Sequence, residues 1–329
     1  MARIAVDAMG GDRAPEEVVH GAVAAARSGI EVILVGDEPR LDALLADAEA
    51  AGELEVVPAS QVIGMGEDPA SAIRDKKDAS VTVAAQLVAA GDAEGMVSAG
   101  STGAAMAAAV FVIGRLAGVS RPAIATLLPT GRIILDAGAN LSCRAEHLVQ
   151  FAVMGAALSS SHFDIAEPTV GLLNIGEEEG KGRDLEKEAY RLMASVPGIN
   201  FVGNVEGRDL ATERADVIVT DGFTGNVMLK TAEGAARMAL RLMLDAVSDP
   251  QYQEAVATLA PALMTVRGRL DPESTGGAPL LGVKGNVVIA HGSSSRIAIR
   301  NAIALAAEGA DHHLPARIEK GLTATSSVV

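Results

Sequence analysis

Cysteine and aromatic residues are nearly absent from this 329-residue sequence, which has one cysteine, no tryptophan, two tyrosines and five phenylalanines. A single cysteine excludes a disulfide-stabilised scaffold and a cysteine-rich zinc site. Positive charge is also scarce, since 27 Lys and Arg residues stand against 42 Asp and Glu for a formal net charge of −15. Nucleic-acid-binding surfaces need basic residues and stacking rings, so this class of protein is excluded.

Long hydrophobic runs are missing as well. The longest one, Ala104–Gly114, falls well short of the ~18 residues that a membrane-spanning helix needs. The first residues lead directly into a predicted strand and show no signal peptide, so we expect a cytoplasmic protein. Small aliphatic side chains are abundant, and the 49% hydrophobic content predicts a globular fold with a sizeable core.

Short β-branched runs alternate with alanine-rich helical stretches along the chain. Several runs are continuously apolar, which is typical of strands with helices on both faces. The predicted strands are Arg3–Val6, Glu31–Val35, Leu54–Val57, Gly95–Ser98, Ala123–Leu128, Arg132–Leu135, Thr169–Asn174, Asn200–Val202, Asp216–Thr220 and Val287–Ala290. The predicted helices are Glu16–Arg27, Pro39–Ala51, Val81–Ala90, Ala104–Leu116, Ala145–Ser160, Leu185–Ala194, Val227–Val247 and Arg296–Glu308. This alternation predicts an α/β fold with a doubly wound, mostly parallel sheet.

Glycine and small polar residues gather directly after six of the predicted strands. The segments are Asp7–Asp12, Ser98–Gly103, Asp136–Asn140, Asn174–Gly182, Asp221–Asn226 and His291–Ser295. Because the carboxyl ends of parallel strands share one sheet edge, where ligands bind, we expect these loops to form one site. Each loop alone is also explained by ordinary turn chemistry. The candidate phosphate- and substrate-binding residues are Asp7, Gly10, Gly11, Ser98, Gly100, Ser101, Thr102, Gly103, Asn140, Asn174, Gly176, Asp221, Thr224, Gly225 and Ser293.

The loop Ser98–Gly103 has the pattern of an anion-binding cradle. A strand ends, glycines free the backbone, and Ser101 or Thr102 can cap the helix that follows. The N–H groups and dipole at the start of a helix favour a phosphate. Plain helix capping is the alternative interpretation of this loop.

Two nucleotide-binding motifs are absent. The stretch from Gly176 to Lys181 is one residue short of a P-loop, and Gly182 replaces the Ser or Thr that would bind magnesium. No strand is followed by G-x-G-x-x-G, which disfavours ordinary NAD enzymes. We predict no metal site and no cofactor; Asp7 and Asp12 could hold a cation, but we favour a role in capping the helix after Pro15.

Lys181, His291 and the pair Cys143 and His147 are the candidate reactive groups. A lysine between glycines suits an anionic substrate, although pairing with the preceding glutamates is the stronger interpretation of Lys181 on local grounds. His291 can act as an acid, a base or an anion donor, or can be a structural histidine. For Cys143 and His147 we favour a small buried cysteine and a helix histidine over a nucleophilic pair.

Together these segments resemble the phosphate acyltransferases of bacterial phospholipid synthesis, the PlsX family. The resemblance runs from the first strand to about Ala306, with small departures at Ser101 and Ser142. The matching segments are Ile4–Asp12, Ser98–Ala104, Arg121–Ala125, Leu135–Asn140, Gly171–Gly182, Phe201–Gly207, Asp221–Asn226, Gly276–Gly282 and His291–Ser294. It implies a three-layer α/β/α fold similar to those of phosphotransacetylase and isocitrate dehydrogenase, and it implies a homodimer.

The resemblance also implies a reaction and its partners. Inorganic phosphate attacks the thioester of a long-chain acyl-acyl carrier protein, and the acyl phosphate feeds a membrane glycerol-phosphate acyltransferase. Because phosphate is the nucleophile, the enzyme needs only to position it and stabilise the oxyanion. We predict that Lys181 and Asn226 do so, with His291 close by. The alternatives are a phosphotransacetylase-like enzyme using acyl-CoA and a non-catalytic module that binds carrier protein or anions.

We expect one domain over residues 1–309, with residues 248–270 protruding as a helical hairpin and residues 310–329 forming a tail. The apolar stretch 252–266, followed by Arg267 and Arg269, predicts peripheral contact with the inner face of the cell membrane. Packing in a homodimer or around the acyl chain is the alternative. Because the net charge is negative, docking to acidic partners needs local basic patches. The candidates are Arg74, Lys76, Lys77, Arg237, Arg241, Arg267 and Arg269.

Overall fold

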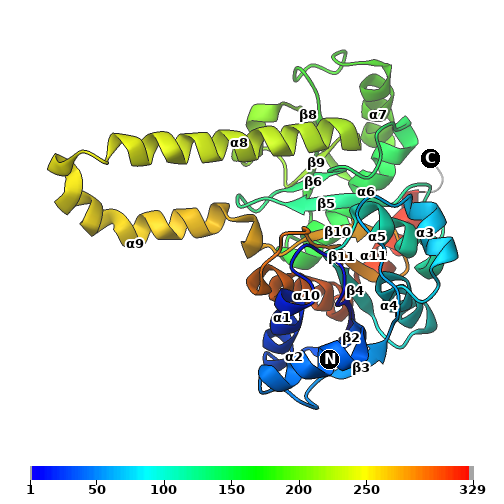
Figure 1. Ribbon diagram of the computed structural model, residues 1–329. Coiled ribbons are helices and arrows are strands. Elements are labelled where there is room, and N and C mark those ends of the chain that lie inside the picture. Colours follow the sequence, from blue (N-terminus) through cyan, green and yellow to red (C-terminus); the bar gives the residue numbers. More distant parts are fainter. Residues whose placement is uncertain (1, 326–329) are drawn as a thin grey trace.

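A computed structural model describes residues 2–325 of the chain. A single eleven-stranded sheet forms its centre, in the order β3-β2-β1-β4-β11-β10-β5-β6-β9-β7-β8 (Figure 1). The strands are β1 Arg3–Asp7, β2 Glu31–Gly36, β3 Glu55–Pro58, β4 Gly95–Ser98, β5 Ala123–Leu127, β6 Ile133–Leu135, β7 Thr169–Leu173, β8 Asn200–Val205, β9 Val217–Val219, β10 Ala278–Leu281 and β11 Asn286–Ile289. The sheet is mostly parallel, as predicted.

Helices cover both faces of the sheet, which gives the three-layer architecture. One face packs against α1 (Glu16–Arg27), α2 (Glu38–Asp47), α6 (Ala145–His162), α7 (Asp184–Ser195), α10 (Arg296–Asp311) and α11 (Leu314–Thr325). The other packs against α3 (Pro69–Asp75), α4 (Ser80–Ala90) and α5 (Thr102–Ala108), which continues as a π-helical turn over Ala109–Ile113. The predicted α/β fold with a doubly wound, mostly parallel sheet is confirmed.

The direction of the strands reverses across the middle of the sheet. Strand β10 is antiparallel to both of its neighbours, β11 and β5, and β5 is antiparallel to β6. The parallel set β1, β2, β3, β4 and β11 therefore runs opposite to the parallel set β6, β7, β8 and β9. The prediction that six loops share one sheet edge is wrong, because the carboxyl ends of the two sets point in opposite directions.

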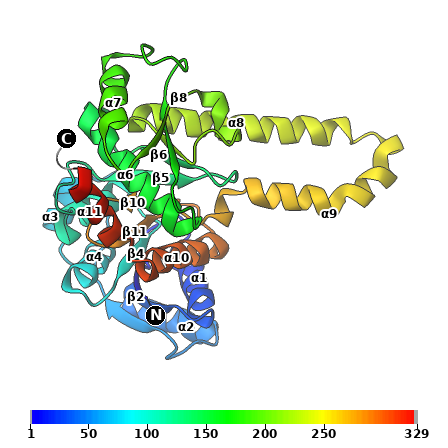
Figure 2. The same ribbon diagram turned by 180° about the vertical axis from the view of Figure 1, so that it is seen from behind.

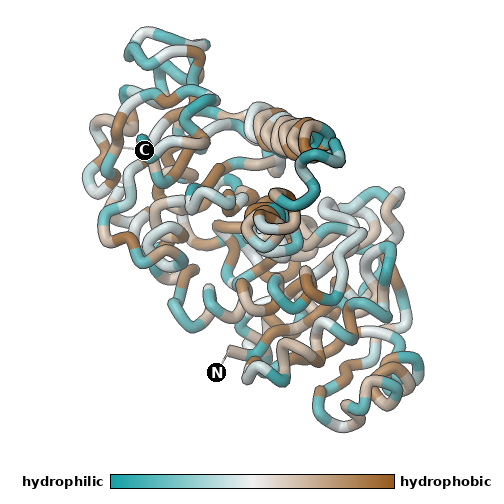
Figure 3. Tube along the Cα trace, turned by 90° about the vertical axis from the view of Figure 1, so that its left-hand side faces the viewer, coloured by the Kyte–Doolittle hydropathy of each residue, from teal (hydrophilic) through white to brown (hydrophobic). Residues whose placement is uncertain are grey.

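Two long helices project from the body as a hairpin (Figures 1 and 2). They are α8 (Gly222–Ala246) and α9 (Gln253–Leu270), joined by a turn that includes the short helix Pro250–Tyr252. The hairpin expected within residues 248–270 is therefore longer, and residues 252–266 are its returning arm rather than a separate hairpin. Pro261 lies inside α9 without ending it. Figure 3 looks along the hairpin from its tip.

The C-terminal residues pack onto the body. Leu314, Ile318 and Leu322 of α11 are buried in the core cluster that includes Phe151 of α6. The expectation of a tail over residues 310–329 is wrong as far as Thr325, because an amphipathic helix places three leucine or isoleucine side chains on α6. The remaining residues, 326–329, lie outside the described part of the chain. No helix in residues 2–325 has the length and apolar character to cross a bilayer.

Candidate active site

The loops after β1, β4 and β11 meet at one end of the sheet and form what we call the first loop group. Its segments are Asp7–Asp12, Ser98–Gly103 and His291–Ser295. The backbone N–H of Asp12 donates to the carbonyl oxygen of Gly292 at 2.7 Å. A Cβ atom on Gly10 would lie 2.9 Å from the backbone nitrogen of Gly100, so only glycine permits this approach. These predicted binding loops are in direct contact.

Asp7 and Ser98 hold the first loop group together from inside. Both side chains are buried, and Ser98 Oγ donates to Asp7 Oδ2 at 2.6 Å while accepting from the N–H of Gly100 at 3.1 Å. Burial raises the pKa of Asp7, and the serine hydrogen bonds oppose this only in part. Asp7 does not cap α1, whose N-cap is Pro15 without a side-chain bond, because its carboxylate is committed to Ser98.

The start of α5 is the part of this group best placed to contact an anion. Ser101 is the N-cap and accepts from the N–H of Ala104 at 3.5 Å, as the sequence predicted. Thr102 is exposed beside it. Gly103 has a structural role, because a Cβ there would lie 2.6 Å from Cγ of Pro69 in α3. Gly11 likewise adopts a φ of +118° that favours glycine.

His291 is exposed at the rim of the first loop group. Its Nδ1 accepts from the backbone N–H of Ser293 at 3.2 Å and lies 2.7 Å from the hydroxyl of the same residue. In a neutral ring this leaves the proton on Nε2. His291 therefore presents an N–H donor to the solvent side of the loop.

The loops after β6, β7 and β9 form a second loop group. Its segments are Asp136–Asn140, Asn174–Gly182 and Asp221–Asn226. Asp136 is buried and accepts hydrogen bonds from the backbone of Ile124 and of its own loop, including one of 2.7 Å from the N–H of Asn140. Burial raises the pKa of Asp136 despite these bonds. Asn140 also donates its side-chain amide to Asp136 at 2.8 Å.

Asp221 caps α8 and is held by an arginine that the sequence analysis did not single out. Its carboxylate accepts from the N–H and hydroxyl of Thr224 at 2.8 and 2.9 Å, and from Arg183 at 2.8 Å. Burial alone would raise the pKa of Asp221, but the bonds from Thr224 and Arg183 outweigh it and the pKa lies below its usual value. Asp221 is a buried carboxylate that stays ionised.

Arg183 links two carboxylates at the start of α7. Besides Asp221, it pairs with Glu186, whose carboxylate also accepts from the backbone N–H of Arg183 at 2.7 Å. These hydrogen bonds raise the pKa of Arg183 above its ordinary value. The only sequence signal was its place directly after the glycine-rich loop, followed three residues later by a glutamate in a capping box.

Asn226 and Gly225 join α8 to the loop after β6. The amide nitrogen of Asn226 donates to the carbonyl oxygen of Ala137 at 3.1 Å. A Cβ on Gly225 would collide with the carbonyl oxygen of Asp136, so this glycine is required by packing. The role of Asn226 in catalysis remains a prediction.

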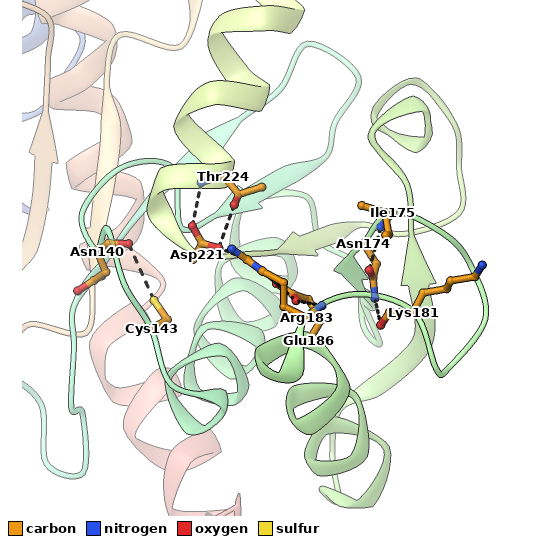
Figure 4. Close-up of polar contacts among 9 residues, drawn as sticks. All are labelled: Asn140, Cys143, Asn174, Ile175, Lys181, Arg183, Glu186, Asp221 and Thr224. Carbon is orange, nitrogen blue, oxygen red and sulfur yellow. Dashed lines mark hydrogen bonds and ion pairs between the residues drawn. The ribbon is translucent and has the colours of Figure 1, made fainter.

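Lys181 does not point into the second loop group. Figure 4 shows its side chain directed away from Asp221, and its ammonium lies 3.8 Å from the carboxylate of Glu178 with half of the side chain exposed. Asn174 donates to the Lys181 carbonyl oxygen at 3.1 Å and accepts from the N–H of Ile175 at 2.8 Å. Gly176 lies against the Lys181 side chain. Arg183, rather than Lys181, is the basic side chain of this segment that contacts Asp221.

The two loop groups are separate in this chain. None of the hydrogen bonds or ion pairs within residues 2–325 joins one group to the other. His291 belongs to the first group, whereas Lys181 and Asn226 belong to the second, so these predicted catalytic residues are not in mutual contact. Both groups border one hydrophobic cluster, which includes Ala104 of α5 and is packed by Met228 of α8.

The sole cysteine, Cys143, is a poor nucleophile. Burial and the nearby carboxylates of Asp136 and Asp221 raise its pKa to about 11. Residues 2–325 contain no group of three or more His, Cys, Asp or Glu placed to hold a metal ion. The geometry thus favours the structural interpretation of Cys143 and leaves the loop backbones and the exposed side chain of Arg183 accessible to a ligand.

The fold of the chain resembles that of phosphotransacetylases. A phosphotransacetylase from Streptococcus pyogenes superposes with a TM-score of 0.63 and 19% identity over 94% of each chain. A branched-chain phosphotransacylase from Enterococcus faecalis V583 gives a TM-score of 0.60 and 16% identity, covering 95% of this chain and 100% of that one. At such identities the likeness defines the fold alone.

The family follows from the sequence. The chain belongs to the family described as "Fatty acid synthesis protein", whose profile matches residues 2–317. It is 49% identical over 317 residues to a phosphate acyltransferase of Pelotomaculum thermopropionicum, covering 95% of this chain and 92% of that protein. It is 48% identical over 329 residues to a phosphate acyltransferase of Desulforamulus reducens, covering 98% of each. The resemblance to the phosphate acyltransferase family is confirmed.

Proposed function

We infer that this chain is a phosphate acyltransferase, which moves a fatty acyl group from acyl carrier protein to inorganic phosphate in phospholipid synthesis. The observation that carries this function is the 45–49% identity to proteins of that name over nearly the full chain. In the reaction a phosphate oxygen bonds to the thioester carbon and the carbonyl becomes an oxyanion. The C–S bond then breaks, which gives acyl phosphate and the carrier's thiolate, and the thiolate takes up a proton.

We propose the residues that contact the substrates from the positions of their hydrogen-bonding groups in the two loop groups. The N–H groups at the start of α5, beside Ser101 and Thr102, and the exposed Nε2–H of His291 are donors for phosphate or for the oxyanion. Asp221 and Arg183 form a charged pair at the start of α8, and Asn226 lies one turn further along.

An assay of thiol release tests the activity directly. With acyl-acyl carrier protein as the donor, we expect free thiol to appear only when inorganic phosphate is present, together with acyl phosphate. Acyl-CoA tested side by side separates the phosphotransacetylase-like alternative, which would use it equally well. Binding of the carrier protein without phosphate-dependent thiol release would instead support the non-catalytic module.

The hairpin carries apolar side chains that the body does not cover. Leu242, Leu259 and Met264 are 60%, 56% and 62% exposed. Arg267 and Arg269 lie in the last turn of α9 and make no ion pair within residues 2–325. Such an amphipathic surface fits the interface of an anionic bilayer. We propose that the hairpin holds the enzyme at the inner face of the cell membrane, close to the enzyme that consumes acyl phosphate.

Vesicle flotation tests this attachment. We expect the double variant Leu259→Glu and Leu263→Glu to lose binding to vesicles containing anionic lipid, with thiol release in detergent retained. Phe111→Glu is the matched control, because Phe111 is 67% exposed and lies outside the hairpin. Unchanged flotation would overturn the proposal. A shift of the double variant from dimer to monomer in sedimentation would show instead that a second copy covers the hairpin in the predicted homodimer.

A further inference from the structure

A polar cavity of about 360 Å³ lies at the start of α6, between residues 115–121 and residues 142–147. Its volume falls within the ~300–1,000 Å³ range of small-ligand sites. The side chains that matter for its chemistry are those of Arg115, Arg121, Arg144, His147 and Cys143. None of them belongs to either loop group.

The positive charge of this cavity is largely uncompensated. Arg121 makes no hydrogen bond or ion pair within residues 2–325, and its side chain is exposed to the cavity. Arg115 donates only to the carbonyl oxygens of Val119 and Ser120, at 3.3 and 2.6 Å, which leaves its charge unneutralised. One carboxylate, that of Glu146, faces Arg144 at 3.6 Å. Three guanidinium groups line the cavity, whereas the nearby carboxylates of Asp136 and Asp221 accept hydrogen bonds from their own loops and from Arg183, so the cavity is suited to an anion.

His147 adds a hydrogen-bond donor that lacks an acceptor. Its Nδ1 accepts from the backbone N–H of Arg144 at 3.2 Å, so the neutral ring carries its proton on Nε2. That Nε2 lies 3.3 Å from Nη2 of Arg144, which is also a donor. Burial and the charges of Arg144 and Arg121 lower the pKa of His147, which keeps the ring neutral. An anion that accepts hydrogen bonds from both Nε2 of His147 and Nη2 of Arg144 would satisfy the two donors.

We propose that this cavity binds the phosphoryl group of a substrate, with Arg121 and Arg144 as its main contacts. Guanidinium forks match phosphate oxygens in pairs, and the cavity has room for more than a bare ion. It adjoins the second loop group, because Cys143 Sγ lies 3.9 Å from the carbonyl oxygen of Asn140. The choice of ligand rests on the proposed function, which supplies two phosphoryl groups: inorganic phosphate and the phosphodiester of the carrier's pantetheine arm.

Cys143 gives a site-specific reporter, since it is the only cysteine and lies on the cavity wall. We would measure its alkylation by iodoacetamide at about pH 9, because its raised pKa makes labelling slow at neutrality. At a phosphate concentration about ten times the dissociation constant, labelling should slow roughly tenfold relative to sodium chloride of equal ionic strength. The assay contains no acyl donor, so its outcome is independent of turnover.

Variants decide whether Arg121 and Arg144 are the contacts. Protection is the ratio of the labelling rates without and with phosphate, measured separately for each variant. Arg121→Gln and Arg144→Gln should each lose most of this protection. Arg317→Gln, which removes an exposed arginine of α11, should retain it. Protection by inorganic phosphate identifies the co-substrate as the ligand, whereas protection by phosphopantetheine alone identifies the carrier's arm. The proposal would be overturned if neither phosphate nor phosphopantetheine protected the wild type. It would also be overturned if Arg121→Gln were protected as strongly as the wild type.

Discussion

Arg183 keeps the buried carboxylates beside the second loop group ionised. It bonds to Asp221 at 2.8 Å and to Glu186, so one guanidinium holds two largely buried carboxylates. An uncompensated buried carboxylate takes up a proton at a higher pH. Replacing Arg183 should therefore change the ionisation of Asp221 before it changes the fold.

Arg183→Gln should lower kcat and move the acid limb of the pH–rate profile to higher pH. The bonds from Arg183 lower the pKa of Asp221, so their loss raises the pH at which its carboxylate protonates. Steady-state kinetics from pH 5 to 8 would measure this, with a loss of about tenfold or more expected for a charged group in the site. Arg191→Gln, on the exposed side of α7, is the control. An unchanged profile would remove Arg183 and Asp221 from the mechanism.

The sequence predicted the binding loops better than the orientation of their side chains. Ser101 caps α5 and Asp221 caps α8, because both roles depend on residue type and on a local turn. Lys181 was proposed as a catalytic residue because it stands between glycines, and Arg183 was not considered. The direction of Lys181 depends on the path of the loop and on Glu178, and neither can be obtained from the local pattern.

Helices α1 and α10 show how the elements are held in place. Glu17 of α1 accepts from the backbone N–H of Arg296 at 2.7 Å and pairs with its guanidinium at 2.7 Å, so it completes the first turn of α10. One turn further along α1, Gly21 lies directly against Ile299. The start of α10 follows the His291 loop, so this contact also positions the first loop group.

The ion pair of Glu17 predicts a pH dependence of stability. Hydrogen bonds from the side chain and backbone of Arg296 lower the pKa of Glu17 from 4.5 to about 2. A carboxyl whose pKa is lower when folded stabilises the protein above the unfolded value, and this contribution is lost as pH falls toward the folded value. Glu17→Gln should therefore lower the thermal midpoint at neutral pH, and the deficit should shrink between pH 4.5 and 2. Glu188→Gln is the control, and a pH-independent deficit would contradict the prediction.

Gly21→Ala should destabilise the protein by about 1–3 kcal/mol, the usual range for overpacking. The added methyl group would lie 2.6 Å from Cβ of Ile299 and 2.8 Å from the carbonyl oxygen of Arg296. Gly234→Ala in α8 is the matched control, because nothing lies within 4 Å of the new atom. Helix propensity should make that variant more stable by about 0.5–1 kcal/mol. Urea unfolding of both would show whether they differ in sign.

Most strands and helices were predicted from the sequence, but strand β10 was missed. The predicted helix at Glu16–Arg27 is observed with those bounds. The residues of β10 include Pro279, and a proline disfavours a strand in the middle of a sheet. The two antiparallel pairings of β10, with β11 and β5, cancel in direction, and the antiparallel pair of β5 with β6 is what reverses the second set of strands. Such long-range pairing leaves no local signal.

At the scale of the whole molecule, the net charge of −15 opposes the approach of an acidic carrier protein. The basic side chains that make no ion pair are therefore the candidates for contacting the carrier protein. Lys76 is paired with Glu67 at 2.7 Å, and Arg74 faces Asp75 at 3.5 Å. Arg241, Arg267 and Arg269 of the hairpin have no ion pair within residues 2–325. The hairpin thus offers uncommitted positive charge, as does the cavity at the start of α6 with Arg115 and Arg121.

Charge reversal on the hairpin should weaken carrier docking and leave phosphate use unchanged. Arg267→Glu combined with Arg269→Glu replaces attraction by repulsion, so the KM for acyl-acyl carrier protein should rise about tenfold at low ionic strength. Added salt should reduce the difference, because it screens exposed charges. The KM for phosphate should stay constant, since both arginines lie on α9, away from either loop group. Arg317→Glu with Lys320→Glu on α11 makes the same change in net charge elsewhere. If that control raised the carrier KM equally, the effect would come from net charge and the docking surface would not be the hairpin.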